Sequence, residues 1–277
     1  MSLPQKKGSS LFKRKPAFNL VFWLLPLTLF GCSVDKSFIF FPDTTIRETP
    51  AAASLPFEDI YLTTKDHVRI NAWYVPHTQG KATLLWFHGN GGNLSDRVDQ
   101  LRVFHAALPL HILMVDYRGY GKSAGSVSEE GTYLDAEAAF DYLRSQPNTG
   151  KIIVYGQSLG AGVATELTLR RDVAALILEA PFLSIREMAK VHYGWLPLGS
   201  LITTQYDNIS KIGRVNKPVL IFHGDADETV PYAHGQRLFA AANEPKQLYT
   251  IKNGGHNDVY EVGNKAYFKT LTSFMNM

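Results

Sequence analysis

Residues 152–162 read IIVYGQSLGAG, and this stretch decides the fold. The apolar residues 152–155 are typical of a buried strand, and the residues from Leu159 onward have the spacing of a helix. Ser158 lies between the two, with Gly156 two residues before it and Gly160 two residues after it. Small residues at these positions allow the sharp turn that lifts a serine hydroxyl clear of a sheet. The stretch therefore predicts a nucleophile elbow.

Apolar, β-branched runs alternate with helical patterns on both sides of this stretch. Unbroken apolar strands separated by helices predict a mostly parallel sheet covered on both faces, that is, a doubly wound α/β fold. An opening hairpin adds an antiparallel strand at one edge. The expected strands cover residues 60–63, 68–75, 83–87, 111–116, 152–155, 174–178, 219–222 and 247–251, and the expected helices cover 96–107, 132–144, 159–171, 234–242 and 266–275.

A second copy of the Gly-x-Ser-x-Gly pattern occurs at residues 121–125, so context has to separate the two serines. Ser123 lies several residues beyond the strand that ends near Asp116, and a loop follows it, whereas Ser158 directly joins a strand to a helix. We therefore favour Ser158 as the nucleophile. Residues 119–123 also resemble the end of a P-loop, but Asp116 stands where the first glycine is required, which excludes a phosphate cradle.

A base and an acid are expected to follow the serine in the chain. His256 lies in a glycine-rich loop after the last expected strand, and a histidine there can reach the elbow and carry a proton at neutral pH. For the acid, Asp227 lies just after the strand 219–222 and is the preferred candidate. Asp225 in the same turn and Glu179 at the end of the neighbouring strand remain alternatives.

Catalysis by such a serine also needs backbone amides directed at the developing oxyanion. The amide of Leu159 provides one, and the amide of Asn90, in the run HGNGGN at 88–93, is the best candidate for the other. The same run also has a purely structural interpretation, as a tight turn in which Asn93 or Ser95 caps the following helix. Both interpretations can hold together.

Five spaced motifs carry a resemblance to a known family. They are HGNGGN (88–93), DYRGYGKSAG (116–125), YGQSLGAG (155–162), HGDADETVP (223–231) and GGHND (254–258). In this order they resemble the BEM46-like branch of the α/β-hydrolases, which is related to the S33 peptidase type. The resemblance runs from about residue 38 to the C-terminus. It implies Ser158, Asp227 and His256 as a catalytic triad, and it assigns residues 119–125 to a structural loop.

The segment between the sixth and seventh expected strands, residues 182–215, is the usual site of a cap in such sheets. It is short, and Phe182, Tyr193 and Trp195 are candidate pocket residues, together with the adjoining Leu196 and Pro197. The alternative is that these side chains only pack the cap on the core. A short cap predicts an open cleft, which favours small or medium acyl substrates.

The N-terminal region has the pattern of a bacterial lipoprotein leader. A basic stretch ending at Lys15 is followed by the apolar run 17–30 and by Gly31 and Cys32. We expect cleavage before Cys32, lipid attachment to this single cysteine, and anchoring in the cell envelope, at the outer membrane if the bacterium is Gram-negative. The alternative is an uncleaved signal anchor, but about 14 apolar residues fall short of the roughly 20 that a span requires.

Domain organisation and charge follow from this division. We expect a leader (1–31), a tether that partly packs on the body (32–57) and one hydrolase domain (58–277). All five cations of the leader precede any acidic residue, so the rest of the chain, with 23 basic and 25 acidic residues, is nearly neutral. Nothing in this balance indicates a nucleic-acid partner.

The combined motifs predict a serine hydrolase that cleaves carboxylic esters or related acyl bonds through an acyl-serine intermediate. A small-molecule acyl substrate is then the partner, besides the membrane reached through Cys32. We expect no cofactor, because the sequence has no His-Glu-x-x-His motif, no cysteine cluster and no P-loop. Two alternatives remain: an amide or peptide hydrolase of the S33 type, and a non-catalytic envelope lipoprotein that uses the fold for binding.

Overall fold

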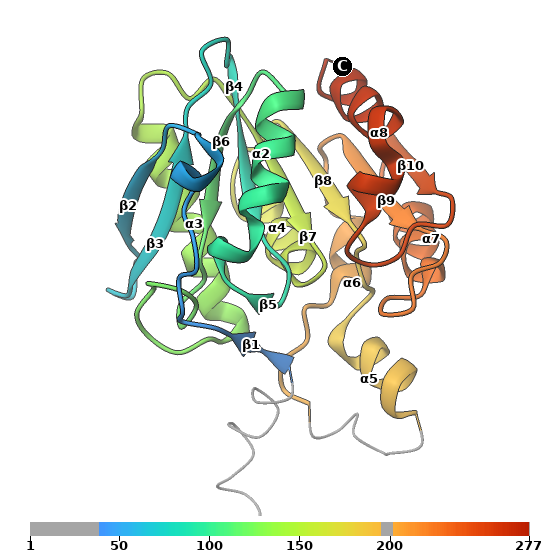
Figure 1. The fold of residues 1–277 in the computed structure, drawn as a ribbon. Helices are drawn as coiled ribbons and strands as arrows, with labels where there is room; N and C mark the ends of the chain where they lie inside the picture. Colours follow the sequence, from blue (N-terminus) through green and yellow to red (C-terminus); the bar gives the residue numbers. More distant parts are fainter. Residues whose placement is uncertain (1–38, 195–201, 277) are drawn as a thin grey trace, which may run out of the picture.

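The computed structural model describes residues 39–194 and 202–276, which form a central sheet with helices on both faces (Figure 1). Eight strands lie in the order β10-β9-β8-β7-β4-β6-β3-β2. Strand β3 pairs antiparallel with both of its neighbours, β2 and β6, and the other pairings of this sheet are parallel. The strands are β2 (Glu58–Thr63), β3 (Arg69–Val75), β4 (Ala82–Phe87), β6 (His111–Val115), β7 (Lys151–Gln157), β8 (Ala175–Glu179), β9 (Val219–Gly224) and β10 (Lys246–Ile251). The prediction of a doubly wound, mostly parallel sheet is confirmed.

Two hydrophobic clusters, one on each face, explain why the central strands are apolar throughout. Leu85 and Phe87 of β4 belong to one cluster, and Leu84 and Trp86 belong to the other, as the alternation of side chains along a strand requires. Helices α3 (Glu129–Ser145), α4 (Leu159–Arg170) and α7 (Tyr232–Ala241) contribute to the first cluster. Helices α2 (Val98–Ala107) and α8 (Val259–Met275) contribute to the second.

The helices differ from the sequence prediction mainly at their ends. Helix α3 begins at Glu129, because the side chain of Ser128 caps it by accepting a hydrogen bond from the Gly131 amide. Helix α8 begins at Val259 instead of 266. It contains Asn264 with φ 46°, a left-handed conformation that interrupts the helical spacing on which the prediction was based. The described part of the cap after β8 contains two short helices, α5 (Ile185–Tyr193) and α6 (Asn208–Ile212).

The segment 39–57 lies against the body. Its short strand β1 (Phe41–Pro42) pairs in parallel with β5 (Gly91–Gly92), and the two form a separate two-stranded sheet. Two 3-10 turns, η2 (Pro50–Ala53) and η3 (Leu94–Arg97), precede β2 and α2. None of the helices in the described residues has both the length and the hydropathy that a membrane span requires.

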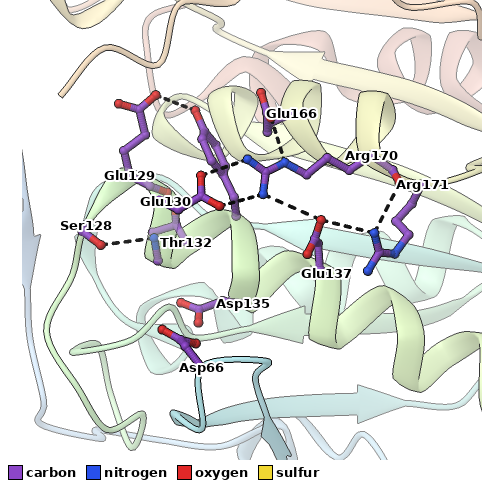
Figure 2. A network of polar contacts seen from close by, with 12 residues as sticks. Asp66, Ser128, Glu129, Glu130, Thr132, Asp135, Glu137, Glu166, Arg170 and Arg171 are labelled. Carbon is purple, nitrogen blue, oxygen red and sulfur yellow. Dashed lines mark hydrogen bonds and ion pairs between the residues drawn. The ribbon is translucent and has the colours of Figure 1, made fainter.

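Ion pairs fix α4 against α3, as Figure 2 shows. Arg170 forms a two-pronged contact with Glu130 (2.9 Å for both pairs of atoms) and a further contact with Glu166 (2.8 Å). Arg171 reaches Glu137 at 3.2 Å. Single exposed ion pairs contribute little, but this network joins several charges at the helix that begins beside Ser158.

Candidate active site

Ser158 lies at the turn between β7 and α4, in a backbone conformation that is rare for a residue other than glycine. Its φ and ψ are 51° and −113°. The turn is tight, because a Cβ atom on Gly160 would lie 2.1 Å from the carbonyl oxygen of Phe87, and one on Gly156 would lie 2.3 Å from that of Gly160. The two glycines are therefore required by close backbone approach, as the nucleophile-elbow pattern predicts.

Three loops at the carboxyl ends of β7, β9 and β10 bring Ser158, Asp227 and His256 together. The Ser158 Oγ lies 2.9 Å from His256 Nε2, and His256 Nδ1 lies 2.8 Å from Asp227 Oδ2. Because a carboxylate only accepts, Nδ1–H donates to Asp227, and Nε2 is then free to accept the serine proton. Such a chain of hydrogen bonds can activate a hydroxyl for nucleophilic attack.

Asp227 is buried, yet its surroundings favour the charged form. Oδ1 accepts hydrogen bonds from the amides of Thr229 and Val230, both at 2.8 Å. Burial alone would raise the pKa of Asp227, but hydrogen bonds from His223 and His256 outweigh it and hold this pKa well below its ordinary value. A charged carboxylate here fixes the orientation of the imidazole and stabilises its protonated form.

The two competing acids have other partners. Asp225 is exposed, and its Oδ1 accepts a hydrogen bond from the Asn253 amide at 2.6 Å. Glu179 is fully buried and accepts hydrogen bonds from Gln157 Nε2 (3.0 Å) and Tyr267 Oη (2.7 Å). Of the three candidate acids, Asp227 is the one whose carboxylate contacts the imidazole of His256.

Ser123, in the second copy of the pattern, has a structural environment. It is 8% exposed, and its Oγ donates to the Asp116 carbonyl oxygen (2.7 Å) and accepts from the Asn71 amide (2.8 Å). Both hydrogen-bonding functions of the hydroxyl are thus used by the backbone, and no base accepts its proton.

The glycine-rich loop (residues 88–93) lies beside the elbow. The position that a Cβ of Gly89 would take is 3.7 Å from the Cβ of Ser158, so the next amide, that of Asn90, belongs to the immediate surroundings of the nucleophile. The amide of Leu159, the first residue of α4, has no acceptor within its own helix. The structural interpretation of this run also holds, because the Asn93 side chain accepts from the Ser95 amide at 2.8 Å and caps η3.

Comparison with known proteins places this geometry in a family. The family model described as serine aminopeptidase, S33, matches residues 78–209. Protein bem46 of Schizosaccharomyces pombe is 35% identical over 238 residues, covering 82% of this chain and 79% of the relative. The α/β-hydrolase domain-containing protein WAV2 of Arabidopsis thaliana is 36% identical over 250 residues, covering 82% and 81%. The chain belongs to the α/β-hydrolase family.

Solved structures agree with the fold of this hydrolase. The esterase Pf2001 of Pyrococcus furiosus superposes with a TM-score of 0.71 at 19% identity, covering 85% of this chain and 98% of the esterase. The enzyme Est1E of Butyrivibrio proteoclasticus, solved with ferulic acid bound, superposes with a TM-score of 0.66, also at 19% identity, over 79% and 100% of the two chains. At such identities the likeness concerns the fold alone.

The candidate pocket residues have different positions in the hydrolase. Phe182 is 3% exposed and packs edge-on against Tyr206 with ring centroids 6.5 Å apart, so it serves the packing of the cap on the core. Tyr193 is 47% exposed at the end of α5. Trp195, Leu196 and Pro197, like the leader and Cys32, lie outside the described residues.

A surface groove lies apart from the site, and no group of metal-binding side chains among the described residues adds to it. A groove of about 510 Å³ lies between β2 and α3, but none of Ser158, Asp227 and His256 lines it. Within the described part of the chain, no three His, Cys, Asp or Glu side chains are grouped so that they could hold a metal ion.

One residue of the site was missed by the sequence analysis. The buried His223, the last but one residue of β9, has its Nε2 2.9 Å from the Val230 carbonyl oxygen and 3.4 Å from Asp227 Oδ2. It lies against the same carboxylate oxygen as His256 and helps to keep the carboxylate charged. The signal was available, since a histidine directly precedes Gly224 and Asp225 where the strand ends.

Proposed function

We propose that this protein is a serine hydrolase that cleaves carboxylic esters or related acyl bonds through an acyl-serine intermediate. The observation that carries the proposal is the chain of hydrogen bonds from Ser158 through His256 to Asp227, with lengths of 2.9 and 2.8 Å. These distances are those expected of a nucleophile, its base and the group that orients the base.

The reaction follows from the positions of these atoms. As the Ser158 Oγ attacks the acyl carbonyl carbon, its proton passes to His256 Nε2, and Asp227 stabilises the resulting imidazolium. The amides of Leu159 and Asn90 donate to the developing oxyanion, each contributing on the order of a hundredfold in rate. The imidazolium then protonates the leaving alcohol as the carbon–oxygen bond breaks. Water, deprotonated by His256, hydrolyses the acyl-serine and restores the hydroxyl.

The substrate class is proposed from the cap. In its described part the cap contributes two short helices between β8 and β9, and α5 has no buried residue. A cap of this short length favours an open cleft and therefore esters of small or medium acyl chains.

The proposal is tested by labelling with a fluorophosphonate probe and by hydrolysis of nitrophenyl esters of increasing acyl length. We expect stoichiometric labelling of the wild type and of Ser123→Ala, and no labelling of Ser158→Ala. Persistent labelling of Ser158→Ala at the wild-type rate would refute the assignment of the nucleophile.

A second candidate function, hydrolysis of amides or peptides, is favoured by one observation. The family model that matches residues 78–209 is described as a serine aminopeptidase. The two functions use the same nucleophile and differ in the leaving group. Aminoacyl-nitroanilides measured beside nitrophenyl esters separate them, because comparable kcat/KM values on the anilides would rule out a preference for esters.

We further propose that the chain is exported and anchored in the cell envelope through lipid on Cys32. The support is the leader sequence, with its basic stretch, its apolar run and the Gly31–Cys32 junction. Labelled palmitate is expected to be incorporated by the wild type in bacterial cells and not by Cys32→Ala. Equal incorporation by both proteins would refute lipidation at this residue.

A further inference from the structure

The glycine-rich loop is held in two different ways along its length. Its two ends are tied to the core, because Tyr117 Oη donates to the His88 carbonyl oxygen at 2.8 Å and the Leu94 amide donates to Asp116 Oδ1 at 3.0 Å. Neither contact reaches the middle of the loop. The position of the Asn90 amide therefore depends on what holds that middle part.

The segment 39–47, which we call the strap, holds the middle of the loop. Strand β1 of the strap is the partner of β5 of the loop. The Asn90 side chain lies between them and uses both of its polar atoms: Oδ1 accepts from the Phe41 amide at 3.2 Å, and Nδ2 donates to the Ile39 carbonyl oxygen. The strap thus replaces the central sheet as the hydrogen-bonding partner of this part of the chain.

Further contacts continue along the strap. Asn93 Nδ2 donates to the carbonyl oxygens of Asp43 (3.0 Å) and Thr45 (2.9 Å). Arg47 forms ion pairs with Asp43 and, at 2.9 Å, with Asp96. Asp96 Oδ2 in turn accepts from the Asn93 amide at 2.9 Å. The strap is therefore bonded to the loop both at Asn90 and at Asn93.

The strap has anchors of its own, so it can act as a fixed support. Phe40 is 4% exposed and contacts Tyr206 edge-on, with ring centroids 6.2 Å apart. The Asp43 carbonyl oxygen accepts from the Gly121 amide at 2.9 Å. From the other side, Tyr120 Oη donates to Asn90 Oδ1 at 3.0 Å. The structural loop that contains Ser123 and the strap thus hold the Asn90 side chain between them.

We infer that strap residues 39–47 are positioning residues for hydrolysis, because they fix the Asn90 amide where the oxyanion forms; this inference rests on the proposed function. A backbone donor stabilises an oxyanion only if it is already in place when charge develops. Glycines at 89, 91 and 92 give this loop more backbone freedom than other residues would, so the contacts with the strap restrict it. The segment that leads from the N-terminal region into the body is thereby part of the catalytic apparatus.

The test uses the full chain and the variant Asn90→Ala, which keeps the backbone amide and removes its ties to the strap. With nitrophenyl esters we expect kcat to fall about 10- to 100-fold with KM changed less than about threefold. The rate of labelling by the fluorophosphonate should fall in parallel, while its final stoichiometry stays at one per chain. Amide hydrogen exchange at residues 89–92 should become faster.

The matched control is Asn243→Ala. Asn243 is also half-buried, and its Nδ2 also donates to backbone carbonyl oxygens, those of Gly213 (2.8 Å) and Val215 (3.1 Å), but it lies on the loop after α7. We expect its kcat to equal that of the wild type. A uniform loss of stability that lowers activity in both variants alike would overturn the inference.

A second variant acts from the side of the strap and leaves the loop unchanged. Phe41→Pro removes the amide that donates to Asn90 Oδ1, and we expect a smaller fall in kcat in the same direction. Unchanged kcat and unchanged hydrogen exchange in both Asn90→Ala and Phe41→Pro would overturn the inference. Failure of the proposed function is a separate result, because it would appear as activity that Ser158→Ala retains.

Discussion

The two Gly-x-Ser-x-Gly copies of this chain have the same pattern and opposite environments. Ser158 is partly exposed and has a left-handed φ of 51°, and its hydroxyl donates a hydrogen bond to His256 Nε2. Ser123 is buried, and its hydroxyl is bonded to the backbone at Asp116 and Asn71. The difference lies in where each pattern falls relative to a strand. Of the two serines, the one that is available for chemistry lies where the turn directly joins a strand to a helix.

The acid that completes the Ser158 site gives the largest expected effect. Asp227→Asn should lower kcat by about 10⁴-fold, because an amide at this position no longer fixes the tautomer in which Nε2 accepts the serine proton. Asp225→Asn is the matched control in the same turn, and we expect its kcat to stay within a few-fold of the wild type. The measurement is kcat with a nitrophenyl ester at pH 8. A larger loss in Asp225→Asn would assign the acid to the wrong carboxylate.

Glycines in the two copies should differ in their effect on stability. In Gly160→Ala the new Cβ would lie 2.1 Å from the Phe87 carbonyl oxygen, and we expect a loss of about 3 kcal/mol or more in the free energy of unfolding. In Gly125→Ala the new Cβ would lie 3.0 Å from a methyl group of Val68, at φ +82°, and the expected loss is about 1–2 kcal/mol. Urea unfolding followed by circular dichroism measures both. Equal losses would mean that the elbow is no tighter than the structural loop.

The sequence predicted the sheet and the elbow because both depend on local patterns. Apolar runs mark strands that are buried on both faces, and a serine framed by glycines marks a strand-to-helix turn. The sequence favours Asp227 as the acid but does not exclude Asp225 and Glu179, because spacing along a turn does not give the direction of a side chain. Hydrogen bonds among folded side chains decide it, with only Asp227 of the three in contact with His256.

Two other features had no local signal that the sequence analysis could use. The pairing of β1 with β5 involves two residues on each side, too few for any periodicity, so the sequence predicts only a tether that partly packs on the body. The start of α8 was placed too late, because the left-handed Asn264 divides the helix and its first part was not recognised.

Ser123 itself should matter for stability and not for activity. Ser123→Ala leaves the buried Asn71 amide and the Asp116 carbonyl oxygen without the hydroxyl that joins them, and the expected loss is about 1–3 kcal/mol in the free energy of unfolding. We expect kcat and KM of the folded variant to match the wild type, measured well below the unfolding temperature. A selective loss of kcat at full stability would give Ser123 a part in the reaction and remove the contrast between the two copies.

The smallest expected effect concerns Glu179, whose backbone contacts the amide of Ser158. In the structural loop the amide of Ser123 donates to Tyr120, which carries no carboxylate. The Ser158 amide donates to the Glu179 carbonyl oxygen at 2.9 Å, and the Glu179 side chain is fully buried. Burial raises the pKa of this carboxyl, even though hydrogen bonds from Tyr267 and Gln157 oppose the shift. The folded protein therefore holds the proton of Glu179 more tightly than the unfolded chain does. Its contribution to stability is present below the unfolded pKa, about 4.3, and is lost as the pH rises through the folded value.

Glu179→Gln remains neutral at every pH, so its free energy of unfolding relative to the wild type should rise between pH 4 and pH 8. The rise is at most about 1.4 kcal/mol for each unit by which the folded pKa exceeds the unfolded one. Glu187→Gln should show the opposite trend, because a hydrogen bond from Lys190 lowers the pKa of Glu187. Urea unfolding of the wild type and both variants across this pH range measures the difference. If the difference in free energy of unfolding between Glu179→Gln and the wild type does not change with pH, the carboxyl has the same pKa in the folded and unfolded chains. The buried Glu179 beside the elbow then destabilises the folded protein at no pH in this range.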